Sequence, residues 1–133
     1  MGPMNWPGIV VATLVFFAVG AIWYTALFGK AWQREVGLSA EQLAGGRNMP
    51  AIFAACLLLE FVVVLMLGHL FARLQPSDHV KMMMATGFAL AIMTPAIGIN
   101  YLYQRKSLKL FLIDAGHFLV GMAAVGLVFV LLD

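Results

Sequence analysis

Four long apolar stretches, separated by short polar segments, dominate the sequence. A helix must contain about 20 mostly apolar residues to cross a bilayer, and each stretch reaches that length. The stretches cover residues 8–28, 50–74, 80–103 and 108–132. The pattern therefore predicts an all-α integral membrane protein in which four transmembrane helices form a bundle, with residues 1–133 as a single domain.

The composition excludes a soluble protein. Hydrophobic residues make up 63% of the 133 residues and charged residues 11%, whereas soluble domains average about 45–50% apolar and about 25% charged residues. The formal net charge of +2 is too small and too scattered to indicate a nucleic-acid partner. The single cysteine, Cys56, excludes a disulfide framework within the chain and argues against thiol oxidoreductase chemistry.

Polar residues at the ends of the apolar stretches predict where helices begin. Asn48 and Pro50 are typical of the cap and first turn of the second helix. Ser77 or Asp78 is expected to cap the third helix after a tight turn. In the longest connection, residues 39–42 fit a capping box that opens a short additional helix.

The basic residues are distributed unequally between the two sides of the membrane. Six belong to the first and third connections, and two lie at the opposite side: Lys30, Arg34, Arg47, Arg105, Lys106 and Lys109 against Arg73 and Lys81. Because basic residues accumulate in cytoplasmic connections, we expect both termini outside. In a bacterium this means an inner-membrane protein with periplasmic termini.

Aromatic residues gather near the predicted helix ends, where a ring with one polar edge suits the headgroup region. We interpret them first as membrane anchors: Trp6, Trp23, Tyr24, Trp32, Tyr101 and Tyr103.

Glu60 is the most unusual residue, because it lies about ten residues into the second predicted helix. An acid at mid-membrane costs about 2.5–3.5 kcal/mol on insertion scales. Each neighbouring leucine or valine returns about 0.3–0.6 kcal/mol, so the helix inserts regardless. Glu60 is therefore either a functional residue, as a proton or cation carrier or the counter-charge of a substrate, or a packing residue that is protonated or hydrogen-bonded.

Asp114 and His117 stand three residues apart, on one face of the fourth predicted helix, and Gly121 continues that face. We expect Asp114 either to hold the His117 ring or to pair with a nearby lysine. In the third helix, a 3.6-residue period from Thr86 places Asn100 on the inward face. The candidate intramembrane polar site is therefore formed by Glu60, Asn100, Asp114 and His117.

The residue types of catalytic and metal sites are sparse. The three histidines, at positions 69, 79 and 117, are too dispersed for a metal site, and the Met82–Met84 cluster suits packing better than copper binding. No phosphate loop or nucleophile elbow occurs in the sequence. We therefore expect no metal, no cofactor and no enzymatic activity.

Several short segments together resemble the domain of unknown function 1761 family of small bacterial membrane proteins. The segments are Asn5-Trp6, Gly20–Tyr24, Leu27–Trp32, Asn48-Met49, Ile99–Leu102 and Leu108–Gly116. The resemblance implies about four spanning helices and signature residues at Asn5, Trp6, Gly20, Trp23, Tyr24, Gly29, Lys30, Trp32, Asn100 and Gly116. Asp114 departs from the family pattern, which has asparagine there. The resemblance implies no particular activity.

Two functions compete, and a third, a membrane-embedded enzyme or cofactor binder, ranks below them because the sequence contains no recognisable catalytic constellation. The first is a helix-packing subunit, either of a homo-oligomer or of a larger membrane complex, with the lipid bilayer and other subunits as its partners. The second is a small proton- or ion-coupled transporter or channel that uses Glu60 and His117.

Overall fold

The computed structural model describes residues 2–39, 41–43 and 49–133. It contains four helices that are long and apolar enough to cross a membrane. They are α1 (Trp6–Ile22) continued by the π-helical segment η1 (Trp23–Leu27), α4 (Met49–Leu74), α5 (Asp78–Phe88) continued through η2 (Ala89–Met93) into α6 (Thr94–Tyr103), and α7 (Leu108–Leu132). A short helix, α2 (Gly29–Val36), follows the first span. The chain is thus an all-α integral membrane protein with four spanning helices.

The helices begin where polar side chains accept their first backbone N–H groups. The Ser77 hydroxyl accepts from Val80 and so caps α5, which confirms one of the two predicted caps. Ser107 caps α7 in the same way. In the longest connection, Ser39 and Gln42 exchange reciprocal hydrogen bonds of 2.8 and 3.1 Å, which is the predicted capping box. The predicted cap Asn48 lies outside the described residues.

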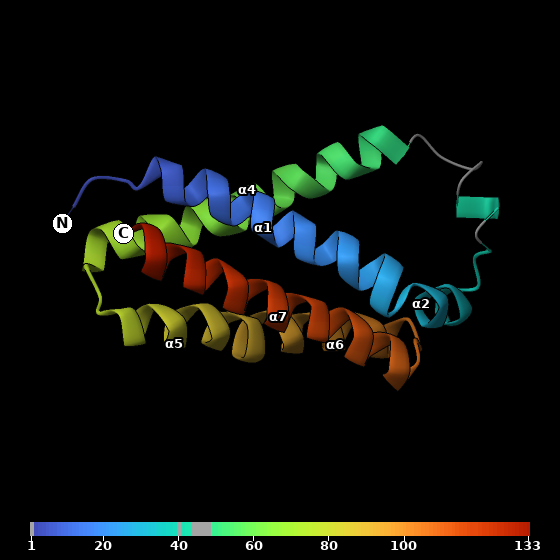
Figure 1. Cartoon of the computed structure of the whole chain (residues 1–133). Helices are drawn as coiled ribbons and strands as arrows, with labels where there is room; N and C mark the ends of the chain where they lie inside the picture. Colours follow the sequence, from blue (N-terminus) through green and yellow to red (C-terminus); the bar gives the residue numbers. More distant parts are fainter. Residues whose placement is uncertain (1, 40, 44–48) are drawn as a thin grey trace.

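Figure 1 shows α7 along the middle of the bundle, with α1 on one side and the α5–α6 helix on the other. The two termini lie at one end, and α2 lies at the other. In α7, 44% of the most apolar 18-residue window is buried, against 11–22% in the other three spans. The helix α7 is therefore the one around which the others pack.

The apolar core lies in the half of the bundle nearer the termini. Ile9 and Phe16 of α1, Val64 and Leu67 of α4, and Phe129 of α7 are almost completely buried there. The rings of Phe71 and Phe129 meet edge to face at 5.2 Å between centroids. This packing fixes the second half of α4 against α1 and α7.

A polar cluster closes the same end of the bundle. Lys81 is buried, and its ammonium group contacts Asp133 at 2.5 Å and Asp78 at 3.3 Å. The Asn5 amide lies 3.4 Å from the Asp133 carboxylate and from the Leu132 carbonyl. These contacts join the starts of α1 and α5 to the end of α7.

Candidate functional site

From its middle to the end nearer α2, the α1–α7 contact is built from glycines that face rings. A Cβ atom on Gly20 would lie 2.9 Å from Nε2 of His117, and one on Gly116 would lie 2.9 Å from Trp23. Gly121 faces Phe16 at 2.6 Å by the same construction. Small residues allow helices in lipid to approach closely. Here the glycines leave room for aromatic and imidazole rings of the facing helix to pack directly against the backbone.

Two side chains of η1 are tied to α7 by hydrogen bonds. The Trp23 indole donates to the Ile113 carbonyl at 2.8 Å, and the Tyr24 phenol donates to Asp114 at 2.5 Å. Tyr101 at the end of α6 donates to the second oxygen of the same carboxylate. Asp114 thereby links three spans at one point. This is the candidate intramembrane polar site as the structure builds it.

Asp114 does not take either of its predicted partners. We expected a bond to His117 or to a lysine, but both carboxylate oxygens accept from phenols. A carboxylate within a bilayer needs such donors, because no water replaces them. The prediction was wrong because Tyr24 and Tyr101 were interpreted as membrane anchors. Tyr24, Tyr101 and Asp114 all lie within six residues of predicted helix ends on the same side of the membrane, and this was the signal in the sequence that would have identified them.

His117 is buried beside this carboxylate, and in the part of the chain that the structure describes neither ring nitrogen has a hydrogen-bond partner. Its ring is 5.1 Å from the Tyr24 ring and 4.8 Å from Phe118 between centroids. An aromatic enclosure therefore holds the imidazole in place. A buried unpaired donor costs about 1–3 kcal/mol, so the packing around this ring must offset that cost.

Asn100 does not belong to the cluster, contrary to the prediction, because it is exposed. The prediction assumed a constant helical period, whereas η2 is a π-helical turn. Such a turn contains one extra residue and rotates everything that follows. The partly buried positions after η2 are Thr94, Ile97, Gly98 and Tyr101. Tyr101 thus reaches Asp114 in place of its neighbour.

Pro95 accounts for the position of η2. Proline lacks the N–H group that would continue the helical ladder, and it follows η2 by two residues. The Thr94 hydroxyl donates to the carbonyl of Ala89 at 2.8 Å, five residues earlier. The hydroxyl is thus a second donor to a carbonyl that already accepts from the Thr94 N–H.

Glu60 lies apart from the Asp114 cluster, on α4. The described hydrogen bonds of Asp114 are those from its two tyrosines. Oε2 of Glu60 is buried without a partner within residues 2–39, 41–43 and 49–133. The reason is the path of α4, which diverges from the bundle toward its first residues (Figure 1). All its buried residues fall between Val64 and Ala72. The four predicted site residues therefore do not form one cluster.

No group of three metal-ligating side chains occurs within residues 2–39, 41–43 and 49–133. The carboxylate of Asp114 is held by phenols, which are hydrogen-bond donors here. The arrangement can bind a proton or fix helices, and its residue types do not indicate a nucleophile or a metal-activated water.

Comparison with known proteins gives one family match. The family model described as a protein of unknown function, DUF1761, matches residues 7–130. The chain belongs to the DUF1761 family. No curated protein and no solved structure matches the chain.

The structure shows where the residues that carry the resemblance to DUF1761 lie. Gly20, Trp23, Tyr24 and Gly116 belong to the α1–α7 contact, and Asn100 lies in α6. The others lie at the two ends of the first span or just beyond it. Asn5 caps α1, and Trp6 beside it is exposed. A Cβ on Gly29 would lie 2.8 Å from the Tyr24 carbonyl oxygen, so glycine allows α2 to start close beside η1. Trp32 meets the Tyr24 ring edge to face at 5.8 Å.

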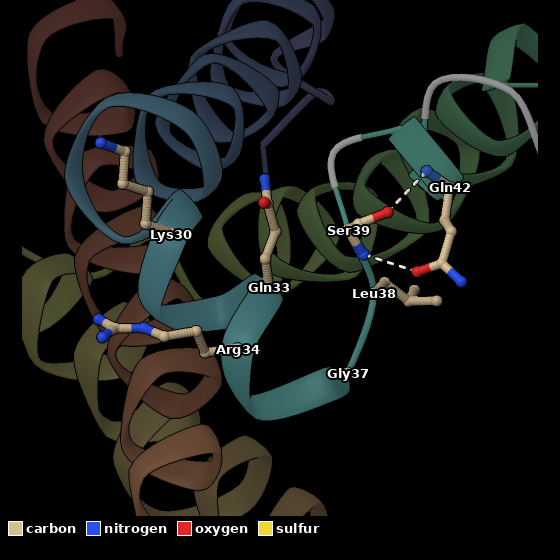
Figure 2. A pocket seen from close by; sticks show the side chains of 7 residues that line it. All are labelled: Lys30, Gln33, Arg34, Gly37, Leu38, Ser39 and Gln42. Carbon is tan, nitrogen blue, oxygen red and sulfur yellow. Dashed lines mark hydrogen bonds between the residues drawn. The ribbon is translucent and has the colours of Figure 1, made fainter.

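Lys30, the remaining residue of the resemblance to DUF1761, lines an open hollow of about 730 Å³ around α2. Figure 2 shows Lys30 and Arg34 on one side of α2, and the Ser39–Gln42 capping pair on the other. Gly37 ends α2 in the left-handed conformation with φ of 77°. The residues that line this hollow include neither Asp114 nor the two tyrosines bonded to it.

Proposed function

We propose that the chain is a non-enzymatic helix-packing subunit that associates with a second copy of itself through the first half of α4. The observation that carries this proposal is that α4 is packed in one half only. Val64, Leu67 and Phe71 are at most 4% exposed, whereas Phe53 on the same side of the helix is 50% exposed.

The packed side of α4 continues into the unpacked half at helical spacing. From Val64 toward the start of the helix, it passes through Glu60, Cys56 and Phe53, at intervals of four, four and three residues. Phe53 touches the ring of Phe17 at 6.1 Å between centroids, and Cys56 is exposed. A side that would face the interior of a closed bundle is therefore left open.

A second copy fits this open side better than lipid does. Oε2 of Glu60 has no hydrogen-bond partner among the described residues, and a polar group in hydrocarbon is costly without one. A protonated carboxyl group is both donor and acceptor. Two Glu60 side chains related by a two-fold axis satisfy each other once each turns its buried oxygen toward the open side. Two-fold symmetry also pairs identical surfaces, and each open half-helix, about 18 Å long, matches the length of its counterpart.

Cross-linking through Cys56 tests this association, because Cys56 is the only cysteine. A disulfide forms only between residues whose Cα atoms approach within about 7 Å. Mild oxidation of membranes that contain the wild-type chain should give a covalent dimer. The matched control is Cys56→Ala with Leu58→Cys, which moves the thiol to the exposed opposite side of α4 and should give far less dimer. Equal cross-linking at both positions, or none at either, would contradict the proposal.

The same proposal places the protein in the bacterial inner membrane with both termini in the periplasm. The unequal distribution of basic residues supports this orientation. Cysteines introduced singly at Ser39 and at His79, in a Cys56→Ala background, test it. A membrane-impermeant maleimide added to intact cells should label the position-79 cysteine and spare the position-39 cysteine.

A proton-coupled transporter that uses Glu60 and His117 is the second candidate. It is supported by the unpaired buried nitrogens of His117 and the unpaired oxygen of Glu60. The substitution Glu60→Gln separates the two functions. A glutamine pair can still bond across a two-fold axis, so association should persist, whereas a carrier that needs Glu60 to bind and release a proton would lose flux in proteoliposomes.

A further inference from the structure

The two ends of the bundle differ in whether their basic residues form ion pairs within the chain. At the end with the termini, Lys81 is buried between Asp78 and Asp133. At the α2 end, five basic side chains are exposed, and none of them forms an ion pair within the described part of the chain: Lys30, Arg34, Arg105, Lys106 and Lys109. The described acids of the two connections at this end are Glu35 and Glu41. A net positive charge therefore remains for an external anion.

The two segments that carry these cations are fastened together. Ser107, between α6 and α7, donates a hydrogen bond to Glu35 of α2. The Trp32 ring packs against Tyr24, which is itself bonded to α7. The helix α2 is thus held beside the start of α7, and its basic residues belong to the same end of the molecule as Arg105 and Lys106.

The depth of these cations matches that of lipid headgroups. Lys30 follows the last residue of the first span by three positions, and Arg105 follows the third span by two. The hollow beside Lys30 and Arg34 also presents the uncharged polar side chains of Gln33, Ser39 and Gln42. Lysine and arginine are the side chains that bind phosphate most strongly. Amide and hydroxyl groups nearby can bond to the hydroxyl groups of a headgroup.

We infer that the α2 end is a binding site for the phosphate headgroup of an anionic phospholipid, centred on Lys30 and Arg34 and extended by Arg105 and Lys106. The inference is independent of the association through α4. It requires that the bundle spans a bilayer, and it assigns this end to the leaflet that contains the anionic lipid.

Thermal unfolding in detergent micelles tests the site, using phosphatidylglycerol and phosphatidylcholine as added lipids. Each lipid should raise the unfolding temperature of the purified chain. The concentration that gives half of the maximal increase should be about tenfold lower for phosphatidylglycerol than for phosphatidylcholine. The variant Lys30→Gln/Arg34→Gln should lose this difference, and Lys30→Arg/Arg34→Lys should keep most of it. Arg73→Gln removes one charge at the opposite end and should leave the difference unchanged. Added salt should weaken the preference, since exposed charges are screened.

The readout is the difference between the two lipids, so a change in basal stability does not imitate the expected result. If Lys30→Gln/Arg34→Gln fails to fold, Arg105→Gln/Lys106→Gln replaces it and should reduce the preference by several-fold. Half of the maximal increase at equal concentrations of both lipids would overturn the inference, as would an undiminished preference in the folded charge-removal variant. Equal stabilisation by glycerol phosphate would show a site for free phosphate and would likewise overturn it.

Discussion

The phenol of Tyr24 and the carboxylate of Asp114 are joined by a hydrogen bond of 2.5 Å, although 90 residues separate them in the sequence. With Tyr101 on the other carboxylate oxygen, this bond joins the first, third and fourth spans. The polar centre of the bundle therefore acts first as a clamp between helices.

Removal of the clamp should destabilise the bundle. Asp114→Ala leaves two phenols without an acceptor and should lower the free energy of unfolding by about 1–3 kcal/mol. Asp114→Asn retains one acceptor oxygen and should cost less. Circular dichroism during titration with a denaturing detergent measures both.

A double-mutant cycle with Tyr24→Phe isolates the bond itself. Because the two groups are in contact, the effects of Tyr24→Phe and Asp114→Ala should be less than additive. Tyr103→Phe is the matched control, since that side chain is 87% exposed, and it should be neutral. Strictly additive effects of Tyr24→Phe and Asp114→Ala would disprove the clamp.

The glycines of the α1–α7 contact should not tolerate a methyl group. Gly116→Ala places a Cβ 2.9 Å from Trp23, whose indole is fixed by its bond to Ile113. Overpacking of this kind costs about 1–3 kcal/mol. Gly87→Ala is the control, because a Cβ there has no neighbour within 4 Å. If both alanine variants unfold at the same detergent fraction as the wild type, the close approach of α1 and α7 is refuted.

The buried lysine at the other end should depend on the charge of Asp133. Asp133→Asn weakens the contact at 2.5 Å and leaves Lys81 with only the longer contact to Asp78. We expect a loss of about 1–3 kcal/mol, below the 3–5 kcal/mol of a fully stranded buried charge. Asp78→Asn should cost less, because its side chain is 68% exposed. A larger loss in Asp78→Asn than in Asp133→Asn would reverse this ranking of the two contacts.

The sequence was sufficient to predict the four spans, because length and hydropathy are local properties of the chain. It also predicted that Asp114 and His117 share a face, since they lie within one turn. The position of Asn100 could not be predicted by a constant period, because η2 adds a residue whose effect accumulates along the helix. The divergence of α4 was equally hidden, since Glu60 occupies the same side of its helix whether or not a neighbour covers it.

Glu60 should matter for association more than for folding. Glu60→Ala removes the proposed carboxyl pair and should weaken the dimer about tenfold, in line with about 1–2 kcal/mol for a polar contact between model membrane helices. Glu60→Gln should associate nearly as well as the wild type. Fluorescence energy transfer between labelled copies, followed at increasing dilution in lipid, gives the dissociation constants. An Ala variant as tightly associated as the Gln variant would exclude Glu60 from the interface.

The distance between two Cys56 side chains in liposomes tests association through α4 most directly. A nitroxide attached to this single native cysteine allows electron paramagnetic resonance to measure the distance between the two labels without any other substitution. Packed helices lie about 8–10 Å apart, so the proposed dimer predicts a narrow distribution on the order of 10–20 Å between the labels. The absence of a defined distance, with the signal of labels distributed at random in the membrane, would contradict the proposal.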